Sequence, residues 1–134
     1  MEEQKRSCEL EKMGCGGCSM LSLSYEKQLK KKQKRLEKLL GKFGKVQPVI
    51  GMENPWHYRN KVISTFTRGE GKRLQSGIYA QGTHRVIPVE RCFLHQPALD
   101  KAVEAVRKAA ADCKYQPYDE DRRTGLIRHV LVRH

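Results

Sequence analysis

The sequence predicts an α+β fold: an antiparallel sheet packed by two amphipathic helices and preceded by an N-terminal cysteine-rich metal-binding loop. Three observations predict it. Two stretches repeat apolar residues at helical spacing, one before and one after a run of short segments rich in β-branched residues. Those segments are separated by glycine-containing turns, as in a meander of antiparallel strands. Four of the five cysteines lie outside both helical stretches, and three of them fall within the first eighteen residues.

Length and charge limit the classes of protein that the chain can represent. With 134 residues, it is expected to form one compact unit, with a metal-binding loop over 1–23 and an α+β domain over 24–134. A net charge of +12 predicts attraction to polyanions, nucleic acid first and a membrane surface second. The sequence contains neither a signal peptide nor an apolar run long enough to cross a membrane, so we expect a cytoplasmic monomer without a membrane partner.

The N-terminal part is expected to be a loop followed by one long helix. The first twenty residues are irregular and contain glycine, which favours a loop. Ser24 is a suitable N-cap, and residues 25–43 then repeat apolar side chains on one stripe while lysines occupy the other faces. Gly41 and Gly44 end the helix. A lysine-rich helix face is more often solvated than bound to RNA.

The middle of the chain predicts three strands. Residues 61–67 are rich in β-branched side chains, and 68–72 form a hairpin turn. A second strand is expected near 76–80. After another turn, the third strand runs over 85–89, which completes an antiparallel meander.

The C-terminal part predicts a second helix and a last strand. Pro97 suits a first helical position, and apolar residues recur on one face as far as Cys113, which is expected to be a small buried side chain there. Residues 126–134 alternate in the manner of a strand. Because the chain stops inside this strand, we expect it to be a piece of a longer protein.

The cysteines indicate a metal centre more than a disulfide framework, because their number is odd and the predicted compartment is reducing. Gly16 and Gly17 separate Cys15 from Cys18, and glycines can take positive φ, so both sulfurs can face one point. An iron–sulfur cluster and a structural zinc ion both remain open on spacing alone. A thioredoxin-like pair would need a preceding strand, and the spacing from Cys8 differs from that of radical enzymes using S-adenosylmethionine.

Ordered blocks along nearly the whole chain resemble the RNA uracil-carbon-5 methyltransferases, which make 5-methyluridine in ribosomal and transfer RNA. The blocks are Cys8, Cys15–Cys18, Leu21–Leu29, Tyr58–Lys61, Gly77–Tyr79, His84–Ile87, the region of Cys92, and Gly125–Arg133. The resemblance implies that Cys8, Cys15, Cys18 and Cys92 ligate a 4Fe–4S cluster, with zinc as the alternative. It also implies a central domain that presents RNA, while S-adenosylmethionine supplies the methyl group in a different domain.

The same residues suggest where RNA would bind. Tyr58, Arg59, Asn60 and Lys61 combine a ring, a guanidinium, an amide and an ammonium, which suit stacking on splayed bases and neutralising phosphates. An edge strand with solvated charges is the alternative interpretation of this segment. Second choices on the last strand are Arg128, His129 and Arg133.

The catalytic part of the family pattern is missing from this sequence. We find no glycine-rich strand-to-helix turn for S-adenosylmethionine and no cysteine for attack on uracil, so no catalytic residue is assigned and the chain alone is expected to be inactive. The resulting hypothesis is the 4Fe–4S-bearing central domain of an RNA (uracil-5-)-methyltransferase. The alternative is a stand-alone zinc- or iron–sulfur-binding module for protein interaction.

Overall fold

The structure is a computed structural model that describes residues 8–134. Internal contacts divide the chain into two compact units. The first comprises Cys8 and Gly17–Pro55, and the second comprises Glu9–Gly16 and Trp56–His134. Residues 1–7 of the predicted 1–23 loop lie outside the described residues. The predicted boundary between that loop and a 24–134 domain stays a prediction.

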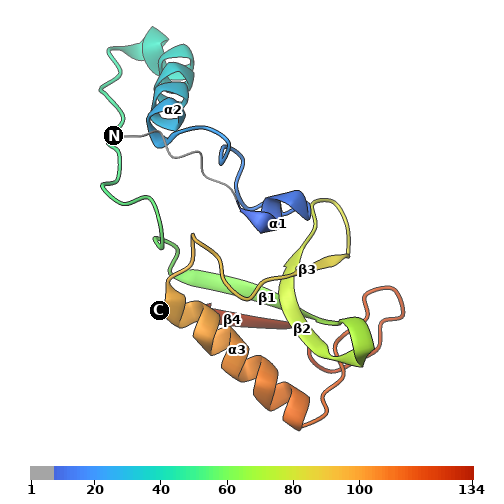
Figure 1. Ribbon diagram of the computed structural model, residues 1–134. Coiled ribbons are helices and arrows are strands. Elements are labelled where there is room, and N and C mark those ends of the chain that lie inside the picture. The colour runs from blue at the N-terminus through green and yellow to red at the C-terminus, as the bar shows by residue number, and fades with distance from the viewer. Residues whose placement is uncertain (1–7) are drawn as a thin grey trace. The chain divides into compact units, whose positions relative to one another are not determined.

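A four-stranded antiparallel sheet forms the centre of the second unit (Figure 1). Its strands are β1 (Lys61–Arg68), β2 (Leu74–Tyr79), β3 (Val86–Pro88) and β4 (His129–Arg133), in the order β3-β2-β1-β4. The predicted three-stranded meander is confirmed, with a short 3-10 turn, η2 (Glu70–Lys72), in its first hairpin. The C-terminal strand adds to β1, so β4 and β3 are the two edges of the sheet.

Helix α3 (Pro97–Asp112) covers one face of this sheet. It starts where predicted, with Pro97 in its first turn, where the missing N–H costs no hydrogen bond. Leu99 and Val103 pack with Val62 of β1 into the core, and Val130 and Val132 of β4 close it from the side. Burial of these apolar side chains is what holds the helix to the sheet.

The opposite sheet face carries the alternate residues of the same strands and remains open in places. Ile63 of β1 and Leu131 of β4 are cross-strand partners, and they are 51% and 57% exposed. Because side chains alternate along a strand, Lys61 and Thr65 share this face with Ile63. The second unit therefore has one packed face and one that is available to a ligand.

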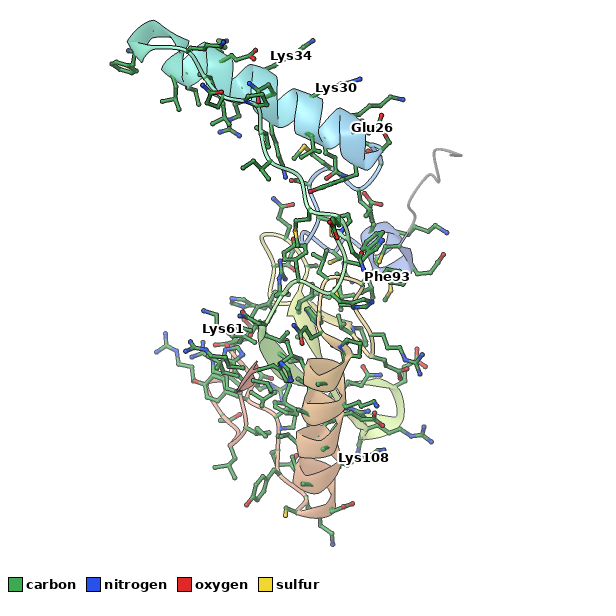
Figure 2. All side chains as sticks on the ribbon, turned by 90° about the vertical axis from the view of Figure 1, so that its left-hand side faces the viewer. Glu26, Lys30, Lys34, Lys61, Phe93 and Lys108 are labelled. Carbon is green, nitrogen blue, oxygen red and sulfur yellow. The ribbon has the colours of Figure 1, made fainter. Side chains whose placement is uncertain are left out.

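The first unit is built on helix α2 (Tyr25–Leu40), continued by the 3-10 helix η1 (Gly41–Phe43). Ser24 caps α2 as predicted, since its hydroxyl accepts a hydrogen bond from the Lys27 N–H. The chain that follows returns along the helix, where Val49 N–H donates to Gln33 Oε1 at 2.8 Å. The side chains of the charged helix residues Glu26, Lys30 and Lys34 extend away from the helix axis (Figure 2).

Two expectations about helices and burial are corrected by the structure. A short helix, α1 (Glu9–Lys12), stands inside the segment expected to be a loop. Cys113 is the C-cap of α3 and is exposed, whereas we expected it to be buried. Of the two long helices, α3 packs on the sheet within the second unit, and α2 belongs to the first unit. Among the described residues, no helix is long and apolar enough to cross a membrane.

Candidate functional site

Two cations stand opposite each other where β1 begins and β4 ends. Lys61 and Arg133 are directly paired in the antiparallel register, so their side chains leave the same face of the sheet. Both are exposed, and neither forms an ion pair with a carboxylate within 8–134. Like charges directly opposite on neighbouring strands repel each other. An anion bound between them would relieve that repulsion.

The segment leading into β1 is fixed beside this cation pair. Arg59 N–H donates to the Leu94 carbonyl at 2.8 Å, and the Arg59 carbonyl accepts from Gln96 N–H at 3.2 Å. The Asn60 carbonyl accepts from His134 N–H at 2.9 Å. Tyr58 stays 50% exposed. The predicted RNA-contact segment Tyr58–Lys61 therefore lies at the same end of the sheet as Arg133, which is also a predicted contact.

The two remaining predicted contacts, Arg128 and His129, lie at the other end of β4. His129 pairs with Thr65, four residues along β1 from Lys61, and its Nδ1 lies 3.0 Å from the Thr65 hydroxyl. The Arg128 guanidinium donates to both carboxylate oxygens of Glu120, at 2.6 and 2.8 Å. The structure thus does not bring these two residues together with the Lys61 and Arg133 pair.

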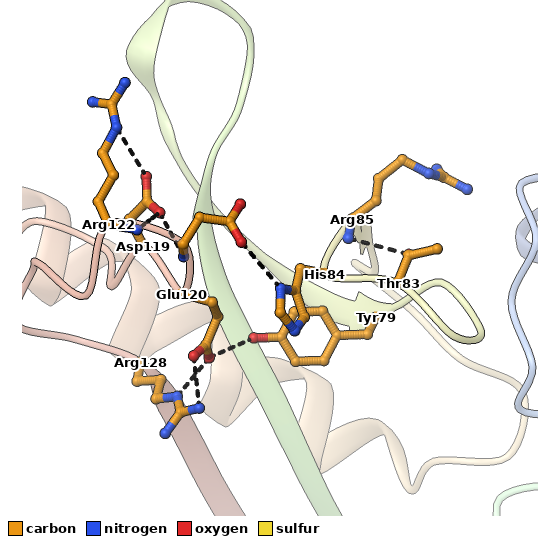
Figure 3. A network of polar contacts seen from close by, with 9 residues as sticks. Tyr79, Thr83, His84, Arg85, Asp119, Glu120, Arg122 and Arg128 are labelled. Atoms are coloured by element: carbon orange, nitrogen blue, oxygen red, sulfur yellow. Dashed lines mark hydrogen bonds and ion pairs between the residues drawn. The ribbon is translucent and has the colours of Figure 1, made fainter.

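A polar network that sequence reasoning missed surrounds Arg128 (Figure 3). The Tyr79 hydroxyl also donates to Glu120, at 3.0 Å, and the Glu120 side chain is only 17% exposed. The hydrogen bond from Arg128 holds the pKa of Glu120 below its ordinary value, although burial acts the other way. Burial and the Glu120 carboxylate raise the pKa of Tyr79. Tyr79 and Glu120 line a cavity together with Thr65, His84 and Tyr118.

The only signal for this network in the sequence is the acidic-then-basic segment 119–123. Such a segment does not indicate which strand it will contact, because Tyr79 and Glu120 are 41 positions apart.

The four predicted metal ligands are partly buried: Cys8, Cys15, Cys18 and Cys92. Cys8 and Cys18 belong to the first unit, and Cys15 and Cys92 to the second. In the part of the chain that the structure describes, no group of three or more His, Cys, Asp or Glu side chains is arranged to hold a metal ion. Four thiolates are the donor set of both a 4Fe–4S cluster and tetrahedral zinc, so the residues fit either group by their chemistry. The ligand set stays a prediction.

The turn around Cys15 differs in detail from the prediction. The residue with positive φ is Gly14, at +90°, whereas Gly16 and Gly17 do not take positive φ. Cys15 N–H donates to the Leu10 carbonyl at 2.9 Å, so the chain turns directly after α1 and before the two cysteines of the pair. A left-handed conformation suits glycine, which explains why Gly14 stands there.

Cys92 lies in a turn beside His95 and Asp100. Its N–H donates to Asp100 Oδ2 at 3.1 Å, while His95 Nδ1 lies 2.7 Å from Asp100 Oδ1. Burial raises the pKa of the Cys92 thiol, but hydrogen bonds from the His95 side chain and the Leu94 and His95 backbone outweigh it and lower the pKa overall. Burial lowers the pKa of His95, yet Cys92 and Asp100 together raise it.

Comparisons with known proteins agree with this arrangement at the level of fold and partial sequence. No family model matches the chain. It is 37% identical over 125 residues to an uncharacterized RNA methyltransferase of Halalkalibacterium halodurans, covering 90% of this chain and 27% of that protein. An uncharacterized RNA methyltransferase of Listeria monocytogenes is 39% identical over 125 residues, with 89% and 27% covered. The chain is similar to one part of the RNA methyltransferases.

A solved structure shows the same fold. It is the tRNA (uracil-54, C5)-methyltransferase of Pyrococcus abyssi in complex with S-adenosyl-L-homocysteine, matched with a TM-score of 0.73 and 20% identity. The match covers 98% of this chain and 29% of that one. The chain therefore spans a little over a quarter of the length of the proteins that it resembles.

Proposed function

We propose that this chain is the RNA-binding central part of an S-adenosylmethionine-dependent RNA (uracil-5-)-methyltransferase, and that it presents RNA for 5-methyluridine formation. The observation that carries the proposal is the identity of 37–39% to RNA methyltransferases over about nine tenths of the chain. The fold shared with the uracil-C5 enzyme of Pyrococcus abyssi supports it. Methyl transfer itself is the work of the remaining three quarters of such a protein, and no residue of this chain is assigned to it.

Contacts with RNA follow from the cation pair and the segment beside it. Lys61 and Arg133 would hold a phosphate between them, because an anion removes their mutual repulsion. The half-exposed ring of Tyr58 would stack on an unpaired base, as in single-stranded RNA recognition generally. Arg59 and Asn60 would contact base edges, and Arg128 and His129 would extend the contact along β4.

Cys8, Cys15, Cys18 and Cys92 would hold a 4Fe–4S cluster, with zinc as the alternative. When bound, such a centre contributes its binding free energy to the folding of the loops that carry the ligands. The cysteines would provide four thiolates, and the lowered pKa of Cys92 favours its thiolate form. Anaerobic purification tests this assignment. A brown protein that contains iron and sulfide supports the cluster, and a colourless protein with stoichiometric zinc supports zinc in its place.

The RNA proposal is tested by the salt dependence of binding to a uridine-containing hairpin, measured by fluorescence anisotropy. The double variant Lys61→Gln, Arg133→Gln removes the proposed site for one phosphate. The slope of log K against log salt should become shallower by about 0.7, because each neutralised phosphate of a single strand contributes about 0.7. Folding should be intact, since the substitutions relieve a repulsion.

A matched control removes the same two charges elsewhere. Lys101 and Lys108 are exposed on α3, away from the open sheet face. The variant Lys101→Gln, Lys108→Gln should keep the wild-type slope. Equal loss in both double variants would mean that net charge alone attracts RNA, and absence of binding by the wild-type chain would overturn the RNA role.

A further inference from the structure

We propose that the cavity lined by Tyr79, His84 and Tyr118 binds one unpaired base of the RNA strand. The base is one with an exocyclic amino group, and it is therefore a neighbour of the uridine that is methylated, not that uridine itself. This inference rests on the proposed RNA-binding function and adds a second contact site to it. The residues that carry it all belong to the second unit.

The cavity lies on the open face of the sheet, away from the cation pair. Thr65 and Thr67 of β1 line it. Side chains two residues apart leave the same face of a strand, so this is the face that carries Lys61 and Ile63. Thr65 is four residues from Lys61, about 13 Å along an extended strand. One RNA strand can therefore contact the cations at one end and place a base in the cavity at the other.

The cavity has the size and the lining that suit a single base. Its volume is about 230 Å³, below the roughly 300–1,000 Å³ of pockets for drug-sized ligands. Three residues with rings line it, Tyr79, His84 and Tyr118, and the ring centroids of Tyr79 and His84 lie 6.0 Å apart. Such rings stack on bases that are splayed out of a single strand. The sugar and phosphate of the bound nucleotide would stay outside.

Hydrogen bonds hold the lining residues in position without a ligand. The Tyr79 hydroxyl donates to Glu120 Oε1 at 3.0 Å, and Arg128 donates to both oxygens of the same carboxylate (Figure 3). The Arg128 guanidinium also lies over the Tyr118 ring, 5.3 Å from its centroid. The network joins β2 to the segment that leads into β4. Binding a base would therefore order few additional side chains, which keeps its entropic cost low.

Carboxylate oxygens at the cavity can still accept hydrogen bonds. Among the residues that the structure describes, Glu120 Oε2 accepts one, from Arg128, and a carboxylate oxygen can accept two. Asp121 also lines the cavity, with one oxygen 3.5 Å from His84 Nδ1 and a side chain that is 86% exposed. Carboxylates select N–H donors, as when Glu or Asp accepts from the amino group of cytosine. Uracil has no amino group, and its carbonyl oxygens would be repelled.

A purely structural role explains this arrangement less completely. The hydrogen bonds among Tyr79, Glu120 and Arg128 would fasten the segment before β4 to the sheet without any ligand. That role requires no cavity beside the network. It also gives no reason for three residues with rings to line a cavity on the face that carries the cation pair.

The test measures binding of the full chain to fluorescein-labelled hexauridylate by fluorescence anisotropy. It is repeated with hexamers in which adenosine or cytidine replaces one uridine, at each position in turn. Tyr118→Leu removes a ring from the cavity, and Asp121→Asn removes a carboxylate. Tyr115→Leu is the matched control, because Tyr115 lies in the same connecting segment, is 45% exposed and does not line the cavity. Fluorescence of Trp56 checks the fold.

At one position of the hexamer, adenosine or cytidine should strengthen wild-type binding about tenfold, the size expected for one hydrogen bond to a charged group. The quantity compared between variants is the ratio of this affinity to that for hexauridylate, so that a general change of charge cancels. Tyr118→Leu and Asp121→Asn should both lower the ratio, and Tyr115→Leu should leave it unchanged. A wild-type ratio in both folded variants would overturn the proposal. If Tyr118→Leu does not fold, the exposed substitution Asp121→Asn decides alone.

Failure of this inference is distinguishable from failure of the proposed function. If the wild-type chain binds every hexamer with the same affinity, and binding weakens with salt, the cavity is not a base site while the RNA role stands. If the wild-type chain binds no hexamer, both proposals are overturned.

Discussion

Substitution of Gly77 by alanine should be among the most damaging single changes in the sheet. Gly77 lies in β2 opposite Pro88 of β3, and a Cβ built on it would stand 1.8 Å from the carbonyl oxygen of Ile87. Real Cβ atoms essentially never approach another atom within 3.0 Å, so the two strands would have to separate by more than 1 Å. The obstacle is backbone and cannot swing aside as a flexible side chain would.

The size of the effect follows from what this separation breaks. The β2–β3 ladder has only three residue pairs, and Val89 N–H donates to the Ser76 carbonyl next to the site of the clash. Loss of one or two backbone hydrogen bonds costs about 1 kcal/mol each, and residual overpacking costs about 1–3 kcal/mol. We expect Gly77→Ala to lower the free energy of unfolding by about 3 kcal/mol, a large share of the ~5–15 kcal/mol typical of a domain.

Urea unfolding followed by tryptophan fluorescence measures this directly. Trp56 is the single tryptophan, and its ring lies 5.6 Å from that of Phe93 in the same unit as the sheet. Gly41→Ala is the matched control, because Gly41 has helical φ and ψ and no atom within 4 Å of the added methyl group. It should leave the Trp56 transition unchanged. A wild-type urea midpoint for Gly77→Ala would refute the close approach of the two strands.

Two further predictions concern the core and the polar network. Leu99→Ala should cost about 3 kcal/mol because Leu99 is 1% exposed. Val106→Ala, at a position 38% exposed on the same helix, should cost less than about 1 kcal/mol in the same urea assay. The pKa of Glu120 is lowered mainly by Arg128, so the network stabilises the fold above the ordinary carboxyl pKa and this contribution is lost as pH falls through the lowered value. Glu120→Gln should therefore flatten the decline of the urea midpoint with acid, and an unchanged pH profile would contradict the ion pair.

The elements that were predicted correctly from the sequence are those determined by local sequence patterns, such as capping residues and the alternation of apolar side chains. The N-cap at Ser24 and the first-turn proline Pro97 locate the starts of α2 and α3, since capping chemistry acts within one helical turn. Alternation and turn residues located β1 to β3 to within two residues. The prediction that Cys113 is buried was wrong because the helical periodicity of apolar residues in the sequence continues past the end of α3. Ala110 is the last buried residue of this helix.

The candidate site could be predicted only in pieces. Tyr58–Lys61 and Arg133 were each selected from composition, but their proximity depends on β4 adding to β1, which no local pattern indicates. The links between Tyr79 and Glu120, and between Cys92 and Asp100, are side-chain contacts set by tertiary packing. Asp100 gave no sequence signal beyond an acidic first turn, which is also what an ordinary helix start provides.

The proposed RNA contacts and the proposed metal site meet at one end of the sheet, and this makes them mutually dependent. Arg59, in the segment proposed to contact RNA, donates to the Leu94 carbonyl and accepts from Gln96 N–H. Both partners lie next to the turn in which His95 N–H donates to the Cys92 carbonyl. A metal held by Cys92 would order the 92–96 turn and, through these two backbone hydrogen bonds, the segment that carries Tyr58 and Lys61. Removing the metal should therefore weaken RNA binding without altering any residue that contacts RNA. Without the metal, the conformational entropy of that segment is lost only when RNA binds, and this loss lowers the affinity.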